Sequence, residues 1–261
     1  MIADLSILFY ILLVAVAFLY ASVGHGGASG YLSLMAVFNM PPEVMKPTAL
    51  LLNIFVSLIA FSQFYTANYF RWKLFLPLSI TSIPMSFVGG LIVVDGNVYK
   101  KILGILLLFP VVRFIAFNKK EVINLKQHSF ALALLIGAVI GLLSGMIGIG
   151  GGIILSPVLL LLRWTDQKQA AAISALFIFV NSLSGLAGQL YNGISFNQNM
   201  LLYVLLALSG GVIGSWFGAR KFKQDVLKKI LAFVLLIAII KLLVVSYSPT
   251  FLTQTDHLTI I

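Results

Sequence analysis

The sequence predicts an all-α polytopic membrane protein, built as an inverted repeat of two five-segment halves. The chain has 261 residues, of which 61% are hydrophobic and only 9% are charged, whereas soluble domains carry about 25% charge. Apolar runs of membrane-spanning length recur along it, and two glycine clusters divide it into similar halves. No polar stretch separates further domains, so we expect one transmembrane domain over 1–261, with repeat halves at about 1–120 and 128–248.

Eight apolar runs are long enough to span a bilayer as helices, at about 20 residues per crossing. They cover 5–22, 46–65, 74–93, 98–117, 129–147, 169–190, 200–219 and 227–246. No basic residue precedes the first run, so we expect a retained helix rather than a signal peptide. Two shorter runs, Ala28–Phe38 and Gly152–Arg163, each follow a glycine cluster. They are predicted to be short half-helices of broken crossings.

The distribution of Lys and Arg predicts the orientation. If both short runs cross, four of the seventeen basic residues (Lys46, Lys100, Lys101 and Lys241) fall on one face and thirteen on the other. If both are re-entrant, the division is ten against seven. The positive-inside rule favours the uneven division, which gives ten segments with both termini extracytoplasmic. The net charge of +10 then sets orientation, and no nucleic-acid partner is expected.

An internal repeat relates the two halves. The matched stretches are Gly24–Gly27 with Gly148–Gly151, Thr48–Leu50 with Ser174–Leu176, and Val98–Leu103 with Val226–Leu231. Their offsets are 124, 126 and 128 positions. Because each half has an odd number of segments, the second half is inverted relative to the first. Inverted repeats are common among secondary transporters.

The glycine clusters predict an anion site. Irregular backbone survives at membrane depth only inside protein or beside water, and glycine permits such a break. The helix that follows begins with free N–H groups and the positive end of its dipole, which together attract anions. Two inverted copies would bring two helix starts toward one small anionic substrate. Close helix packing is the alternative, and it suits Gly141 and Gly145 well.

The candidate substrate-binding residues combine the glycines with the polar side chains inside the spans. They are Gly24, His25, Gly26, Gly27, Thr48, Asn53, Gly150, Gly151, Gly152, Ser174 and Asn181. Each polar one has a structural alternative. His25 can be a hydrogen-bonded structural residue, Thr48 and Ser174 can cap or bond back to their own helices, and the two asparagines can join helices.

The same sequence argues against an enzyme. All seven acidic residues fall in predicted loops or termini, so no buried carboxylate relay is available. The chain contains no cysteine, no GxxxxGK[ST] loop, no HExxH motif and no credible nucleophile–base pair. We therefore expect no catalytic residue, no metal site and no cofactor.

Two stretches of the second half resemble the sulfite exporter TauE/SafE family, also called the TSUP transporters. They are GIGGGIILSPVLLLL (Gly148–Leu162) and AAAISALFIFVNSLSG (Ala170–Gly185). The first half departs from the pattern, with Ser33 in place of the proline equivalent to Pro157, and with His25 inside the cluster. The resemblance implies a multi-pass carrier in the cell inner membrane for sulfite, thiosulfate, sulfoacetate or related sulfonates.

The residues and the resemblance together favour a secondary transporter that exports a small oxyanion across the lipid bilayer. A proton or a sodium ion is the candidate coupling ion, and a homodimer is the candidate assembly, because many helix faces are lined with small residues. Two alternatives stay open, a non-transporting membrane scaffold and an anion channel.

Overall fold

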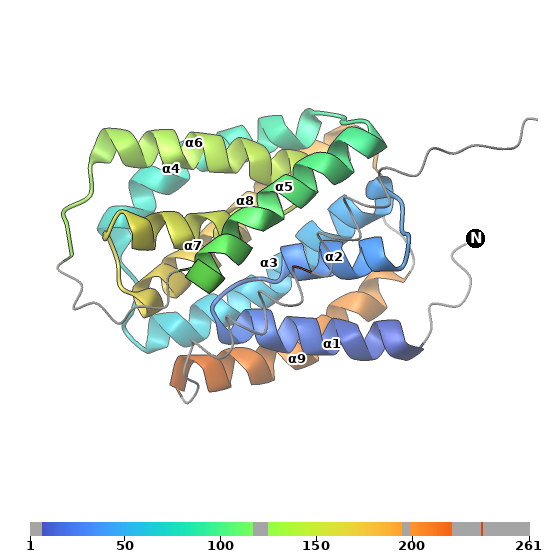
Figure 1. Cartoon of the computed structure of the whole chain (residues 1–261), viewed down its shortest axis with the longest axis horizontal. Helices are drawn as coiled ribbons and strands as arrows, with labels where there is room; N and C mark the ends of the chain where they lie inside the picture. The colour runs from blue at the N-terminus through green and yellow to red at the C-terminus, as the bar shows by residue number, and fades with distance from the viewer. Residues whose placement is uncertain (1–6, 117–124, 195–198, 221–235, 237–261) are drawn as a thin grey trace, which may run out of the picture.

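The computed structural model describes residues 7–116, 125–194, 199–220 and 236, and within them it is all-helical, without a strand (Figure 1). The helices are α1 (Ile7–Ser22), α2 (Ala28–Val37), α3 (Pro42–Thr66), α4 (Trp72–Leu91), α5 (Gly96–Ala116), α6 (Phe130–Ile147), α7 (Gly152–Leu161), α8 (Gln167–Tyr191) and α9 (Met200–Arg220). The all-α prediction is confirmed, and a helix lies over each of the first nine predicted segments. The tenth, 227–246, lies outside the described residues, as does the repeat match at Val226–Leu231.

The distribution of apolar side chains is that of a multi-pass membrane protein. Helices α3, α4, α6, α8 and α9 are long and apolar enough to cross a membrane. Large aliphatic side chains lie on the outside of the bundle, for example Ile80 and Leu135, both 60% exposed, and Leu205, 58% exposed. Such a surface is unfavourable in water but suits contact with lipid.

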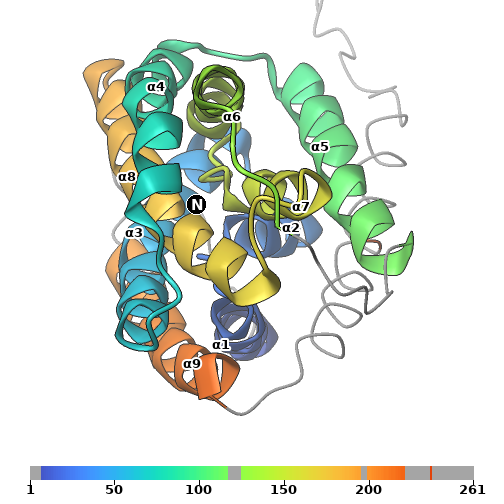
Figure 2. The same ribbon diagram turned by 90° about the vertical axis from the view of Figure 1, so that its left-hand side faces the viewer.

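Two parallel helix pairs are held together by small residues. In the first pair, Gly137, Gly141 and Gly145 of α6 lie against the carbonyl oxygens of Leu78, Ser82 and Ser86 of α4, in that order. In the second pair, Gly210, Gly214 and Gly218 of α9 lie against the carbonyl oxygens of Val14, Phe18 and Ser22 of α1. Figure 2 shows the α4–α6 pair at the top and the α1–α9 pair at the bottom. A Cβ atom at any of these glycines would collide with backbone, so the packing interpretation of Gly141 and Gly145 is confirmed.

Two helical hairpins carry the glycine clusters into the interior. Helices α1 and α2 form one hairpin, α6 and α7 form the other, and Figure 1 shows them entering from opposite ends of the bundle. We call residues 23–27 the first glycine turn and residues 148–151 the second; every residue of both is buried. The long helices α3 and α8 pack against each other behind the turns. This arrangement is consistent with an inverted repeat.

Candidate functional site

A left-handed glycine precedes the short helix in both glycine turns. Gly27 precedes α2 with φ +99° and Gly151 precedes α7 with φ +77°. Both angles lie in the left-handed region, where a side chain is strained. Neither glycine can provide a side-chain cap, so the first N–H groups of both helices keep their capacity to bind a ligand. Helix α8 differs, because Asp166 and Gln169 form a capping box at its start.

Asn53 of α3 lies between the two turns. Its side chain is fully buried, and its Nδ2 donates to the carbonyl oxygen of Ile149 at 3.4 Å and to the Ser182 hydroxyl at 3.3 Å. A Cβ atom at Gly26 would lie 2.6 Å from Asn53 Oδ1, and one at Gly150 would collide with Asn53 Nδ2. Asn53 therefore requires glycine in both turns. Its Oδ1 has no hydrogen-bond partner among the described residues, which is unusual for a buried amide oxygen.

Ile178 of α8 is the apolar neighbour of the same turns. A Cβ atom at Gly26 would lie 2.8 Å from Ile178 Cγ2, one at Gly150 would lie 2.9 Å from it, and one at Gly152 would collide with the Ile178 side chain. Asn53 and Ile178 thus come from the two long helices α3 and α8 and meet at one point. The structure brings Gly26, Gly150, Gly152 and Asn53 together there.

Each turn also packs on the long helix of the other half. A Cβ atom at Gly24 would collide with Ala171 at the start of α8, and one at Gly148 would lie 3.1 Å from the Cα atom of Lys46 at the start of α3. Gly24 and Gly148 are 124 positions apart, while Lys46 and Ala171 are 125 positions apart. Each hairpin therefore rests on the long helix that belongs to the other half of the chain.

Lys46 places a buried positive charge beside the second turn. The residue is only 8% exposed, and its Nζ lies 4.6 Å from the centroid of the Tyr99 ring, an arrangement that stabilises a cation. Lys46, Glu43 and Gln189 line a cleft of about 140 Å³. In the sequence Lys46 was only one basic residue of a predicted outer face, and the structure places it inside α3, with its backbone against Gly148.

Tyr31 adds a hydroxyl group at the first turn. The side chain is fully buried in α2, and its hydroxyl oxygen lies 2.7 Å from the position of a Cβ atom at Gly27. This hydroxyl has no hydrogen-bond partner within the described part of the chain. Sequence reasoning missed Tyr31, Lys46 and Ser182. For Tyr31 a signal existed, because it lies one helical turn after Gly27, on the side of α2 that faces back to the turn.

The other predicted polar residues form hydrogen bonds with groups outside the glycine turns. The Thr48 hydroxyl donates to the Val44 carbonyl oxygen at 2.6 Å, and Asn181 Nδ2 donates to the Phe177 carbonyl oxygen at 2.8 Å, both within their own helices. The Ser174 hydroxyl is 2.7 Å from the Ser156 hydroxyl of α7. The Thr48 bond is the one to its own helix that was its structural alternative, whereas Asn181 bonds within α8 and does not join two helices through this amide. Ser174 stays near the second turn, since a Cβ atom at Gly152 would lie 3.2 Å from its carbonyl oxygen.

His25 and Gly151, which belong to the two turns, both contact neighbouring groups of the protein. The His25 ring is buried, and its Nδ1 lies 3.1 Å from the Val23 carbonyl oxygen, to which it can donate. A Cβ atom at Gly151 would lie 2.8 Å from Ile140 and 2.9 Å from Phe177. A side chain added at Gly151 would therefore strike apolar packing as well as any anion.

Comparisons with known proteins agree with the all-helical membrane architecture. The family model described as "Sulfite exporter TauE/SafE" matches residues 8–242. The chain is 34% identical over 243 residues to the probable membrane transporter protein y4hK of Sinorhizobium fredii, covering 92% of this chain and 97% of that protein.

Two further relatives are more distant. The probable membrane transporter protein MJ0441 of Methanocaldococcus jannaschii is 28% identical over 192 residues, which cover 69% of this chain and 72% of the relative. The probable membrane transporter protein YunE of Bacillus subtilis is 27% identical over 206 residues, which cover 70% of this chain and 71% of the relative. No solved structure matches the chain significantly. The matched family and all three relatives are described as transporters rather than enzymes, and the chain therefore belongs to the sulfite exporter TauE/SafE family of membrane transporters.

Proposed function

We propose that the chain is a secondary transporter that exports a small sulfur-containing oxyanion, such as sulfite, thiosulfate or a sulfonate like sulfoacetate. The observation that carries the proposal is the meeting of two buried glycine turns at Asn53. Each turn begins a helix whose first N–H groups and dipole favour an anion. The sulfur chemistry of the substrate is supported by the family match alone.

Two side chains add to the backbone donors. Tyr31 supplies a hydroxyl, unpaired among the described residues, next to the first turn, and Lys46 supplies a positive charge beside the second turn. Asn53 acts instead by holding the turns, because its Nδ2 already donates to the Ile149 carbonyl oxygen and to Ser182. A desolvated oxyanion needs several such donors, since hydrogen bonds to a charged group are each worth about 1.5–3 kcal/mol. Among the described residues that lie nearest the turn glycines, none is acidic, and Glu43 lines the same cleft as Lys46.

The contacts between each hairpin and the long helix of the other half support alternating access. Each hairpin enters from its own end of the bundle and rests on the long helix of the opposite half. Rocking of one hairpin with its partner helix would open the site to one face while the other stays closed, as in other inverted-repeat carriers. A proton or sodium ion is the candidate coupling ion.

Flux measurements on the full chain in liposomes test the function. We expect uptake of labelled sulfite, thiosulfate or sulfoacetate to be saturable, and to be accelerated by the same unlabelled anion on the opposite side. That acceleration identifies a carrier, whereas linear flux without it would indicate an anion channel. A folded sample that moves none of these anions, nor sulfate, would contradict the proposal and favour a scaffold.

The proposed orientation places the protein in the cell inner membrane with both termini extracytoplasmic. It can be tested because the chain has no cysteine of its own. Val93 is 85% exposed after α4, and Leu125 is 39% exposed before α6, at the opposite end. In intact cells an impermeant thiol reagent should label Val93→Cys and spare Leu125→Cys until the membrane is permeabilised. The reverse pattern would overturn the orientation.

A further inference from the structure

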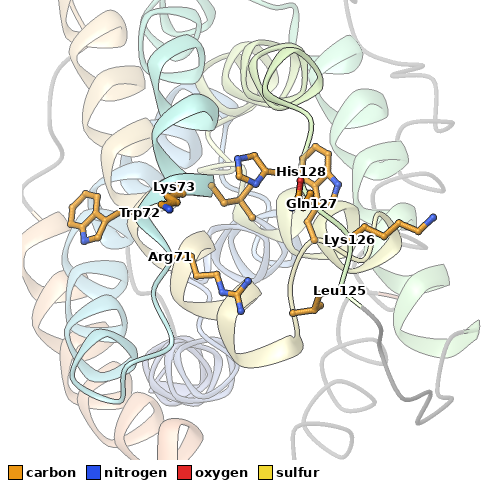
Figure 3. A pocket seen from close by; sticks show the side chains of 9 residues that line it. Arg71, Trp72, Lys73, Leu125, Lys126, Gln127 and His128 are labelled. Atoms are coloured by element: carbon orange, nitrogen blue, oxygen red, sulfur yellow. The ribbon is translucent and has the colours of Figure 1, made fainter.

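A second pocket lies far from the glycine turns, at the end of the bundle where α4 and α6 begin. Its volume is about 500 Å³, and it is formed by the start of α4, by residues 125–128 before α6, and by Trp164 between α7 and α8 (Figure 3). Pockets that bind small molecules commonly measure about 300–1,000 Å³. This pocket is therefore large enough for an organic ligand, and nothing in the proposed transport mechanism uses it.

In the part of the chain that the structure describes, the charged groups around this pocket are all basic. Arg71, Lys73, Lys126 and His128 line it, and no Asp or Glu is among these described lining residues. Figure 3 shows Arg71 below and His128 above the opening, with the Lys126 side chain directed outward on the right. Asp166, two residues after Trp164, accepts a hydrogen bond from the backbone of Gln169 instead. Four basic groups around one cavity, without a carboxylate, favour an anionic ligand.

Two helix dipoles add to this charge. Helices α4 and α6 run parallel, as the ordered contacts of their small residues require, so both positive ends lie at the pocket. Arg71 is the residue before α4, and it forms no side-chain cap. The first N–H groups of α4, those of Trp72 and Lys73, have no partner within the helix, and both residues line the pocket. Backbone donors and arginine together are the usual means of binding a phosphate group.

The inner wall of the pocket is apolar. Leu74 is 2% exposed and Trp164 is 6% exposed, so both are held rigidly behind the basic groups. The Trp164 ring meets the His128 ring edge to face, with centroids 6.1 Å apart. A bare inorganic ion would leave this wall and much of the volume unused. A ligand with an anionic head and a small organic body would use both.

We propose that this pocket binds a phosphate group carried on a small organic moiety. The guanidinium of Arg71 provides paired donors for two phosphate oxygens, and Lys73, Lys126 and His128 provide the remaining charge and donors. The same chemistry is presented by the headgroup of an anionic phospholipid and by a soluble organophosphate. The site lies at the end of the bundle that the charge distribution assigns to the cytoplasm.

Fluorescence of Trp164 provides a direct test, because the chain contains only three tryptophans. The full-length Trp72→Phe/Trp216→Phe variant, in nanodiscs of zwitterionic phosphatidylcholine, reports on Trp164 alone. It would be titrated with glycerol 3-phosphate, with glycerol as the uncharged control, and in parallel prepared with increasing phosphatidylglycerol. We expect a saturable change with at least one phosphate source and none with glycerol.

Variants of the basic residues then identify the site. In that background Arg71→Gln, Lys73→Gln and Lys126→Gln should each weaken the response about tenfold or more, as loss of a charge-assisted hydrogen bond implies. Lys101→Gln is the matched control. Lys101 is exposed and lies near the start of α5, at the opposite end of the bundle, so this variant should leave the fluorescence response unchanged. Size-exclusion profiles would confirm that each variant is folded, and Lys126→Gln, outside any helix, is the variant least able to disturb the fold.

The two sources give different results. Saturation by glycerol 3-phosphate that depends on Arg71 identifies a soluble organophosphate, while a response only to phosphatidylglycerol that depends on Arg71 identifies a lipid headgroup. The absence of a saturable response to both, or a response that is the same in all three variants, overturns the proposal. The basic residues would then only determine the orientation of the protein in the membrane. Because the readout is binding at Trp164, this result is independent of anion flux through the glycine turns.

Discussion

The first and second glycine turns both end on a left-handed glycine but differ in the groups around it. The glycine before α2 and the glycine before α7 both adopt positive φ. At the first turn Gly27 faces the phenol of Tyr31, whereas at the second Gly151 faces the apolar side chains of Ile140 and Phe177. The first turn also carries His25, where the second has Ile149. The first turn therefore has the polar side chains of Tyr31 and His25, whereas the last glycine of the second turn meets only apolar side chains.

The short helices after the turns differ as well. In α2 the Ser33 hydroxyl donates to the Ser29 carbonyl oxygen of the same helix, at 2.6 Å. In α7 the equivalent position is Pro157, and the neighbouring Ser156 hydroxyl meets the Ser174 hydroxyl of α8. Helix α7 is thus tied to its long helix by a buried hydroxyl pair. Glycine thus gives both short helices a left-handed start, while the neighbouring residues make the polar surroundings of the two turns different.

The largest expected effect comes from adding a methyl group to the turns. Gly150→Ala combines φ +74° with a collision against Asn53, so strain of about 1–2 kcal/mol adds to overpacking of about 1–3 kcal/mol. Gly26→Ala carries only the overpacking. The free energy of unfolding should fall most for Gly150→Ala, then for Gly26→Ala, as measured by thermal unfolding in detergent.

Gly193→Ala is the matched control for strain without collision. Gly193 has φ +80°, but a Cβ atom there would meet no atom within 4 Å. It should lose about 1–2 kcal/mol from strain and keep its transport. If Gly150→Ala were no worse than Gly193→Ala, tight packing around Asn53 would not be what demands glycine in the second turn.

The next largest effect is a difference in apparent affinity between variants of Asn53 and Asn181, which lie at similar positions in the two halves of the sequence. Asn53→Leu removes the amide that bonds the Ile149 carbonyl oxygen and Ser182, so the turns lose a common support. The apparent affinity for the transported anion should fall about tenfold, as expected from losing hydrogen bonds worth about 0.5–1.5 kcal/mol each. Asn181→Leu removes an amide that bonds its own helix and should alter stability more than affinity. Concentration-dependent flux in liposomes measures the difference, and equal losses of affinity would place the anion elsewhere.

Tyr31→Phe should separate stability from transport. The Tyr31 hydroxyl is buried without a partner in the described part of the chain, so its removal should leave the free energy of unfolding unchanged or raise it. The apparent affinity for the anion should nevertheless fall, by about tenfold. Tyr20→Phe is the control, because the Tyr20 hydroxyl accepts a bond from Ser29 at 3.0 Å. Normal transport by Tyr31→Phe would remove this hydroxyl from the site.

The smallest effect concerns the hydroxyl pair of the second half. Ser156→Ala and Ser174→Ala should each lower the free energy of unfolding by about 0.5–1.5 kcal/mol, and less than additively together, because they share one bond. Thr48→Val, in the first half, removes only a bond to its own helix and should lose less. A thermal double-mutant cycle measures the coupling, and full additivity would show that the pair does not tie α7 to α8.

Local patterns in the sequence were sufficient for the membrane class, for the first nine helices and for the glycine breaks between α1 and α2 and between α6 and α7. Length of an apolar run, a glycine cluster and the spacing of repeats act over a few turns of helix, so they can be recognised without the tertiary structure. The packing role of Gly141 and Gly145 was recognisable for the same reason. The family, too, was recognisable from Gly148–Leu162 and Ala170–Gly185.

Only the tertiary structure decided which side chains meet at the turns. A step of one residue rotates a helical position by about 100°, so a sequence offset known to within two positions cannot tell whether Asn53 or Asn181 faces the glycines. That choice depends on how α3 and α8 rotate against each other, which also puts Ile178 and Ser182 beside Gly150. The same holds for Lys46, which becomes a buried cation because the second turn and the Tyr99 ring cover it, and those contacts join residues about 50 and 100 positions away in the chain.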